Sequence, residues 1–267
     1  SYDFPGSGAD SMLRVAANHH NPDGGSSWQK LIALADRCAS GTDRTPREKG
    51  DADVEAQSGS GSRSGGGPRF LKTPLVSVWS GIFAPGENRL ACKVKPIRVG
   101  DDSAYPVPYK EDDQLTTGYA GLAAGLEDRI RRLETIAGDR WDLRLAALDD
   151  LLWEFTWCVP SSTMDIPDIS LYSHSRATAA IAVCLAVRAM KGDCTLDPAI
   201  LSDGDAAVCR FAVLDLAGIQ RYIYDMDRTG FKGVAKVLRG RSFYVMLLCE
   251  MAGDMLAREI GLPSISI

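Results

Sequence analysis

Apolar residues recur every three or four positions along much of the chain, which is the spacing of one helix face. In residues 26–40, for example, Leu31, Leu34, Ala35 and Cys38 share one face, with serines at the amino end as candidate N-caps. The pattern predicts helices over residues 11–40 (interrupted by Asn-Pro-Asp-Gly-Gly), 117–138, 141–158, 172–190 and 236–260, the last of which is ended by Gly261 and Pro263. The apolar stripes expected in the second and third of these helices are Leu122, Leu126, Ile130 and Leu133, and Leu143, Leu148, Leu151, Leu152 and Phe155.

Shorter apolar runs predict strands. Residues 75–83 and 90–99 are rich in β-formers and are separated by the turn signal Ala-Pro-Gly-Glu-Asn. Residues 207–218 read as an apolar strand that ends in an Asp and a turn, and residues 264–267 read as the start of another strand. A strand, a long helix and a strand make half of a ferredoxin-like unit.

Residues 50–68 have almost no large apolar side chain after Val54. Such a stretch buries too little surface to offset its ordering entropy, so it predicts a flexible Gly/Ser linker. The linker divides the chain into residues 1–49 and 69–267. The polar start and the unpartnered final strand favour further sequence on both sides.

Composition narrows the function classes. Lys and Arg number 30 and Asp and Glu number 35, for a net charge of −5, which argues against binding nucleic acid by phosphate neutralisation alone. Seven cysteines without a Cys-x-x-Cys pair argue against a zinc knuckle and favour reduced thiols in a cytoplasmic protein. No apolar run reaches the roughly 18 residues of a membrane span.

Four segments resemble the large signature subunit of type III-A CRISPR effector complexes, in that family's order. They are NHHNPD with LADRCASGTDR (18–44), TPLVSVWSGIF (73–83), DISLYSHSRATAAIAVCL (168–185) and LDLAGIQRYIY with AKVLRGRSFYVMLLCE (214–250). The resemblance implies an α+β architecture. Residues 1–49 would be the carboxyl-terminal part of a helical HD-type nuclease domain, and residues 69–267 a first, ferredoxin-like palm domain with helical insertions.

The resemblance implies two activities: metal-dependent cleavage of single-stranded DNA, and conversion of ATP to cyclic oligoadenylate when target RNA is bound. Its implied partners are other effector subunits, guide RNA, target RNA, single-stranded DNA and ATP. The alternative is an assembly module that binds partner subunits and guide RNA without turnover.

For the nuclease, His19, His20 and Asp36 are the candidate catalytic residues, with His20 and Asp36 as metal ligands. The metal would be Mg²⁺ or Mn²⁺, with Ni²⁺ or Co²⁺ as alternatives. The His-Asp dyad of the family does not occur in the chain. A plain alternative is that the two histidines end a helix and that Asp36 is a solvated helix residue.

For the palm, no GGDD turn occurs in the chain. Asp215, Leu216, Gly218 and Ile219 are the candidate nucleotide-binding residues, since a helix start with glycine lets phosphate approach the backbone N–H groups. The alternative is that Asp215 caps the helix and Gly218 serves only the turn.

Several other polar and aromatic residues are expected to serve the fold and not to bind a ligand. Arg239 and Arg241 are expected to clamp neighbouring carboxylates inside the fold, and the alternative is that they steer nucleotide or RNA phosphates. His174 is expected to anchor a helix start, Asp149-Asp150 and Asp112-Asp113 to be solvated, and the tryptophans at 141, 153 and 157 to pack in the core.

Overall fold

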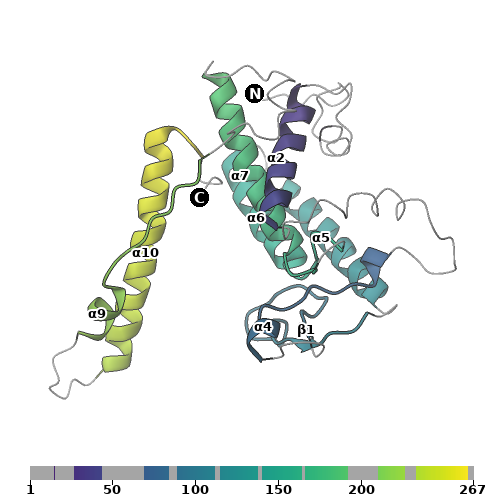
Figure 1. Ribbon diagram of the computed structural model, residues 1–267, viewed down its shortest axis with the longest axis horizontal. Coiled ribbons are helices and arrows are strands. Elements are labelled where there is room, and N and C mark those ends of the chain that lie inside the picture. The colour runs from purple at the N-terminus through teal and green to yellow at the C-terminus, as the bar shows by residue number, and fades with distance from the viewer. Residues whose placement is uncertain are drawn as a thin grey trace, which may run out of the picture. The chain divides into compact units, whose positions relative to one another are not determined.

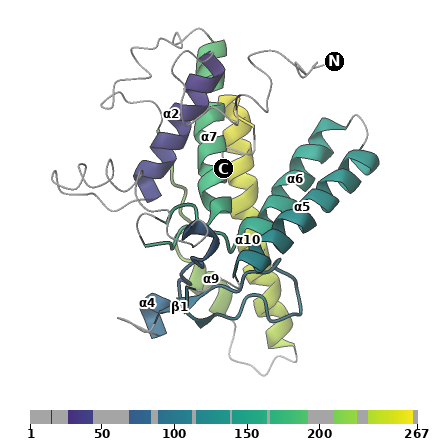
Figure 2. The same cartoon turned by 90° about the vertical axis from the view of Figure 1, so that its right-hand side faces the viewer.

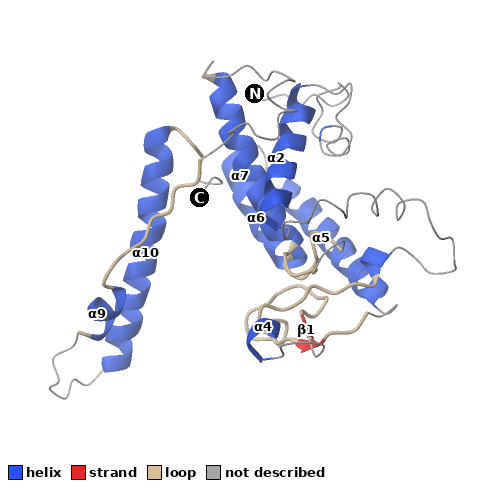
Figure 3. Cartoon of the chain, in the orientation of Figure 1, coloured by secondary structure: helices blue, strands red, loops and turns tan. Residues whose placement is uncertain are grey.

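The computed structural model describes residues 15, 27–43, 69–83, 89–111, 115–137, 140–163, 166–191, 210–225 and 233–263. Over these ranges the chain is mostly helical with one small antiparallel sheet, which agrees with an α+β class (Figures 1 and 3). Contacts divide it into two units, Ala39–Ala177 and Ser1–Cys38 with Thr178–Ile267.

The centre of the Ala39–Ala177 unit is a pair of packed helices, α5 (Leu115–Ala137) and α6 (Trp141–Thr156), which lie side by side in Figure 2. The predicted apolar stripe of α5 is confirmed, because Leu122 is buried and Leu126, Ile130 and Leu133 pack against the same cluster. The buried members of this cluster are Tyr119, Leu122, Leu151, Phe155 and Cys158.

The stripe predicted for α6 is confirmed only in its second half. Leu151 and Phe155 are buried, but Leu143 is exposed. The two helices approach closely at Gly125, where a Cβ atom would lie 2.6 Å from Cε1 of Phe155. The small residue at this position is therefore required by packing.

The segment before α5 is largely irregular. It contains a 3-10 helix η1 (Arg69–Leu71), a short helix α4 (Ser80–Phe83) and the strands β1 (Leu90–Ala91) and β2 (Val107–Pro108). The strands pair antiparallel, with Leu90 opposite Pro108 and Ala91 opposite Val107.

The strand predicted over 75–83 is therefore wrong apart from a single bridge between Val76 and Ala91. The strand predicted over 90–99 is confirmed only at its first two residues. Ser80 explains the change, because its Oγ accepts from the N–H of Leu90 and donates to the carbonyl of Leu90. The hydroxyl of Ser80, at the start of α4, thus makes the two hydrogen bonds to Leu90 that a backbone partner would make in a continued strand pair.

Helix α7 (Leu171–Met190) follows a turn and confirms the helix predicted at 172–190. The Oγ of Ser170 accepts from the backbone N–H of Ser173 at 3.0 Å, which is the geometry of an N-cap. The same turn is fixed by backbone bonds from Leu171 N to Val159 O and from Ser161 N to Ile169 O.

Helix α2 (Ser27–Asp43), whose residues up to Cys38 belong to the other unit, confirms the helix predicted at 26–40, with Leu31, Leu34 and Ala35 buried. Helix α10 (Val234–Ile260) confirms the long helix and ends, as predicted, at Gly261, whose φ of 76° is left-handed. The N–H of Leu262 reaches back to the carbonyl of Ala257.

The strand predicted over 207–218 is wrong for its described part. Residues 210–216 take no regular secondary structure and have no strand partner among the described residues, and Phe211, Val213 and Leu214 are exposed. A strand needs a neighbour to satisfy its backbone groups, so the apolar pattern alone does not make one. The linker 50–68, the first helical run apart from Val15, and residues 264–267 lie outside the described residues.

No helix in the described part of the chain has both the length and the apolar content needed to cross a membrane.

Candidate functional site

Asp36 is the one proposed nuclease residue that the structure describes. It lies in α2 directly after Ala35, which is fully buried, and its own side chain is half-buried. It also takes part in a polar interaction. Asp36 is therefore partly exposed on α2, and its role as a metal ligand stays a prediction.

His19 and His20 lie outside the described residues. Within the described ranges, no three His, Cys, Asp or Glu side chains come together in a way that could hold a metal ion. The ligand set of His20 and Asp36 thus stays a prediction.

The predicted nucleotide-binding residues lie around the start of α9 (Ile219–Tyr224). Gly218 is the N-cap residue and has a left-handed φ of 77°, which a side chain would strain. No side chain makes a capping hydrogen bond there, so Asp215 is not the helix cap of the alternative reading. Asp215 and Gly218 are exposed, and Leu216 and Ile219 are half-buried.

Arg241 fixes the other end of α9. From α10, its Nη1 donates to the carbonyls of Tyr222 at 2.8 Å and Asp225 at 3.0 Å. Its guanidinium also lies over the Tyr222 ring, 5.5 Å from the centroid. The structural role expected of Arg241 is confirmed, although it clamps backbone carbonyls rather than carboxylates.

Arg239 and Asp149 also have partners within the protein. The Nε of Arg239 donates to the carbonyl of Ala235 within α10. Asp149 accepts from the hydroxyl of Tyr172 at 3.4 Å and lies 3.8 Å from the guanidinium of Arg176, so it links α6 to α7 and is not simply solvated. Asp150 is exposed, as expected, and Asp112 and Asp113 lie outside the described residues.

His174 lies in the first turn of α7, as predicted, and its backbone N–H donates to the carbonyl of Ser170. The side chain that caps this helix start is that of Ser170. The core prediction holds for Trp157, which packs against the buried cluster and donates from Nε1 to the carbonyl of Lys95. It is wrong for Trp153, which is 48% exposed, and the side chain of Trp141 is not described.

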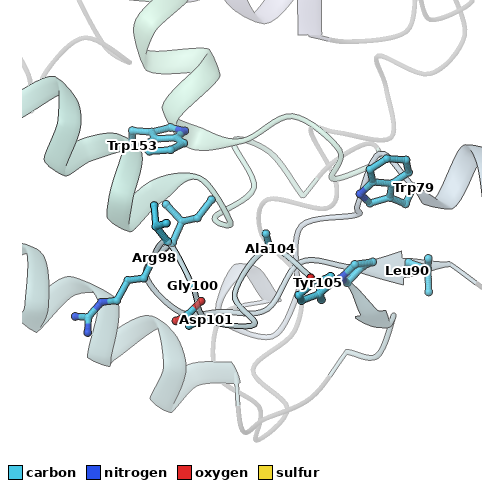
Figure 4. Close-up of a pocket in the computed structure, with 11 residues that line it drawn as sticks. Trp79, Leu90, Arg98, Gly100, Asp101, Ala104, Tyr105 and Trp153 are labelled. Carbon is cyan, nitrogen blue, oxygen red and sulfur yellow. The ribbon is translucent and has the colours of Figure 1, made fainter. Parts of the chain in front are cut away.

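Trp153 lines a cavity of about 770 Å³ that sequence reasoning missed (Figure 4). We call it the aromatic pocket. Its walls are α6, the loop 97–106, the residue before α4, and β1. The lining residues are Trp79, Leu90, Ile97, Arg98, Val99, Gly100, Asp101, Ala104, Tyr105, Pro106 and Trp153. The volume lies within the range of small-ligand sites.

A signal for this pocket exists in the sequence. Leu151 and Phe155 mark the buried side of α6, and Trp153 lies two residues from each, which at about 100° per residue puts it on the opposite face. A large ring on the polar side of an amphipathic helix indicates a contact other than the core.

Two basic side chains support the loop of the pocket. Lys93 and Lys95 both form ion pairs with Asp102, and Lys95 lies 3.5 Å from Asp101. These partners lower the pKa of the Asp102 carboxyl to about 2, chiefly through the hydrogen bonds from Lys93 and Lys95. Hydrogen bonds from Ser103 are the main cause of the lowered pKa of Asp101.

The comparisons with known proteins agree on one family. The model of Csm1 subunit domain B matches residues 208–267. A protein of Methanocaldococcus jannaschii named CRISPR system single-strand-specific deoxyribonuclease Cas10/Csm1 (subtype III-A) is 28% identical over 97% of this chain. Proteins of the same name from Enterococcus italicus and Streptococcus thermophilus are 30% and 29% identical over 87% and 95% of it.

The chain spans about a third of the length of these relatives, with shares of 33%, 30% and 32%. The matched part nevertheless covers nearly all of the chain, including the described elements from α2 to α10. The chain therefore belongs to the Cas10/Csm1 family of type III-A CRISPR systems.

Proposed function

We propose that this chain is part of the large subunit of a type III-A CRISPR effector complex and contributes to metal-dependent cleavage of single-stranded DNA. The observation that carries the proposal is the similarity over 97% and 87% of the chain to relatives named as single-strand-specific deoxyribonucleases. In this function the chain works with other effector subunits and guide RNA.

In the proposed nuclease site, His19, His20 and Asp36 lie around a divalent cation, with His20 and Asp36 as ligands. The cation, Mg²⁺ or Mn²⁺ with Ni²⁺ or Co²⁺ as alternatives, would activate water and neutralise charge on the scissile phosphate. Helix α2 supports this role, because its buried face fixes the backbone from which Asp36 projects.

The palm part of the proposal concerns ATP. Asp215, Leu216, Gly218 and Ile219 would contact the nucleotide during synthesis of cyclic oligoadenylate, with target RNA as the trigger. Two observations support this assignment: Gly218 adopts a backbone conformation suited to glycine, and Arg241 of α10 fixes the carboxyl end of α9 through the Tyr222 and Asp225 carbonyls.

Asp36→Ala in the full-length protein tests the nuclease assignment. Loss of a metal ligand should reduce cleavage of a labelled single-stranded oligonucleotide by at least about a hundredfold, while synthesis of cyclic oligoadenylate stays unchanged. Asp150→Ala, which removes an exposed carboxylate of α6, is the matched control and should cleave like the wild type. Undiminished cleavage by a folded Asp36→Ala protein would remove Asp36 from the site.

The second candidate is a non-catalytic assembly module. It concerns the 267 residues taken by themselves, in which neither the His-Asp dyad nor a GGDD turn occurs and which span about a third of the length of the relatives. Under this reading the protein binds effector subunits and guide RNA, and Asp36→Ala has no effect because no cleavage occurs.

A further inference from the structure

Three large rings are left partly uncovered around the aromatic pocket. Trp79 is 44% exposed, Trp153 48% and Tyr105 69%. Tryptophan is among the most buried residues on average, and exposing such rings forgoes the stabilisation that burial would give. Rings that gather at one cavity in this way indicate a surface that a ligand covers.

We propose that the aromatic pocket binds an unpaired base of single-stranded DNA. The proposal rests on the proposed function for its substrate class, and it adds a binding site separate from His19, His20 and Asp36. Single-stranded nucleic acid is bound through bases that stack on aromatic side chains, largely without regard to sequence. In Figure 4, Trp153 projects from α6 at one end of the pocket, and Trp79 and Tyr105 lie toward the other end.

The walls of the pocket are held in place before any ligand binds. The N–H of Ile97 donates to the carbonyl of Glu154 at 2.9 Å, which ties the loop to α6 beside Trp153. Within the loop, the N–H of Arg98 donates to Oγ of the fully buried Ser103, and the N–H of Ser103 donates to Asp101. Gly100, at a left-handed φ of 87°, makes the turn possible. A preformed pocket saves the entropy of ordering its walls on binding.

Charge places the phosphate at the rim. Arg98 extends outward from the loop, away from Tyr105, and its side chain is 63% exposed. Its Nε is 3.9 Å from the Glu154 carboxylate, which also pairs with Arg129 at 3.3 Å. Arg98 can therefore turn to a DNA phosphate without leaving Glu154 unpaired.

Most charges next to the aromatic pocket are paired with one another, which determines how strongly DNA binding there should depend on salt concentration. Arg98 and Asp101 are the charged residues among those that line the pocket, and Asp101 is paired with Lys95, so Arg98 is the lining cation that can face a phosphate. Stacking should supply most of the affinity, and the pocket should add the counterion release of about one phosphate contact.

The test is equilibrium binding of a fluorescein-labelled oligothymidylate to the full-length protein, measured by fluorescence anisotropy. EDTA is present, so that binding is measured without metal-dependent cleavage of the DNA. Trp153→Ala and Trp79→Ala should each raise Kd by about 5- to 150-fold, the range for loss of one stacked base. Trp153→Phe keeps a ring and should recover most of the affinity. Arg98→Ala should lower the slope of log Kd against log salt by about 0.7.

Trp28→Ala is the matched control, because Trp28 is a tryptophan of α2 that is also 44% exposed. Wild-type affinity in both pocket variants, or equal losses in Trp28→Ala, would overturn the proposal. Normal DNA binding combined with loss of effector assembly in the pocket variants would also overturn it and assign the pocket to a partner protein. A protein that binds DNA through the pocket but does not cleave it would contradict the proposed function and leave this site standing.

Discussion

At the scale of single residues, Asp102 shows how a charged side chain organises a loop. Lys93 and Lys95 both pair with it, and they hold the segment that carries Arg98, Gly100 and Tyr105. The sequence displays these charges, but only the turn at 98–105 brings them together. This is why the ion pairs, unlike the helices, were not predictable from spacing.

The lowered pKa of Asp102 gives a prediction with a defined sign. The folded-state pKa is about 2 against an ordinary value of 3.8. As pH falls, the Asp102 carboxyl is therefore protonated in the unfolded state before it is protonated in the folded state. The stability that its ion pairs with Lys93 and Lys95 contribute is complete above about pH 4 and is lost as pH falls towards 2. Urea unfolding at several pH values should show Asp102→Asn to be less stable than the wild type at pH 7 and to match it at pH 2.

The wild-type protein at high salt serves as a control, since the pair is exposed and should be screened. A difference between variant and wild type that persists unchanged to pH 2 would mean that the carboxylate charge does not hold the loop.

At the scale of elements, the α5–α6 pair depends on one close approach. A Cβ atom added to Gly125 would lie 2.6 Å from Cε1 of Phe155. A Cβ atom added to Gly121 on the same helix would have no neighbour within 4 Å. Both are helix-interior glycines, so they share the same intrinsic cost but differ in packing.

Gly125→Ala should therefore destabilise the protein and Gly121→Ala should stabilise it. Overpacking against the buried Phe155 costs about 1–3 kcal/mol, which outweighs the gain of about 1 kcal/mol in helix propensity. At Gly121 only the gain applies. Thermal or urea unfolding of the two variants measures the difference, and equal stabilisation of both would show that α5 and α6 do not meet at Phe155.

The elements also show what sequence reasoning reaches. Helices α2, α5, α7 and α10 were predictable, because each repeats an apolar stripe over at least four turns. The strands were not, because an apolar run such as 210–216 carries no information on whether a partner strand is present. For the site, Asp36 lies on the predicted helix, but the aromatic pocket needed the 97–106 loop to be folded against α6.

At the scale of the whole molecule, the similarity to the family covers nearly all of the chain, whereas each proposed activity depends on a small part of it. The domain B model matches residues 208–267, while the proposed nuclease residues lie before residue 37. Since the chain spans about a third of the length of its relatives, the proposed activity has to be tested on the full-length protein.

The measurement that tests the central claim most directly is cleavage by the full-length protein of matched single-stranded and double-stranded DNA, with Mn²⁺ and with EDTA. We expect rapid cleavage of the single strand in Mn²⁺, little cleavage of the duplex, and none in EDTA. Absence of metal-dependent cleavage of single-stranded DNA by the folded, full-length protein would contradict the nuclease function and favour the assembly module.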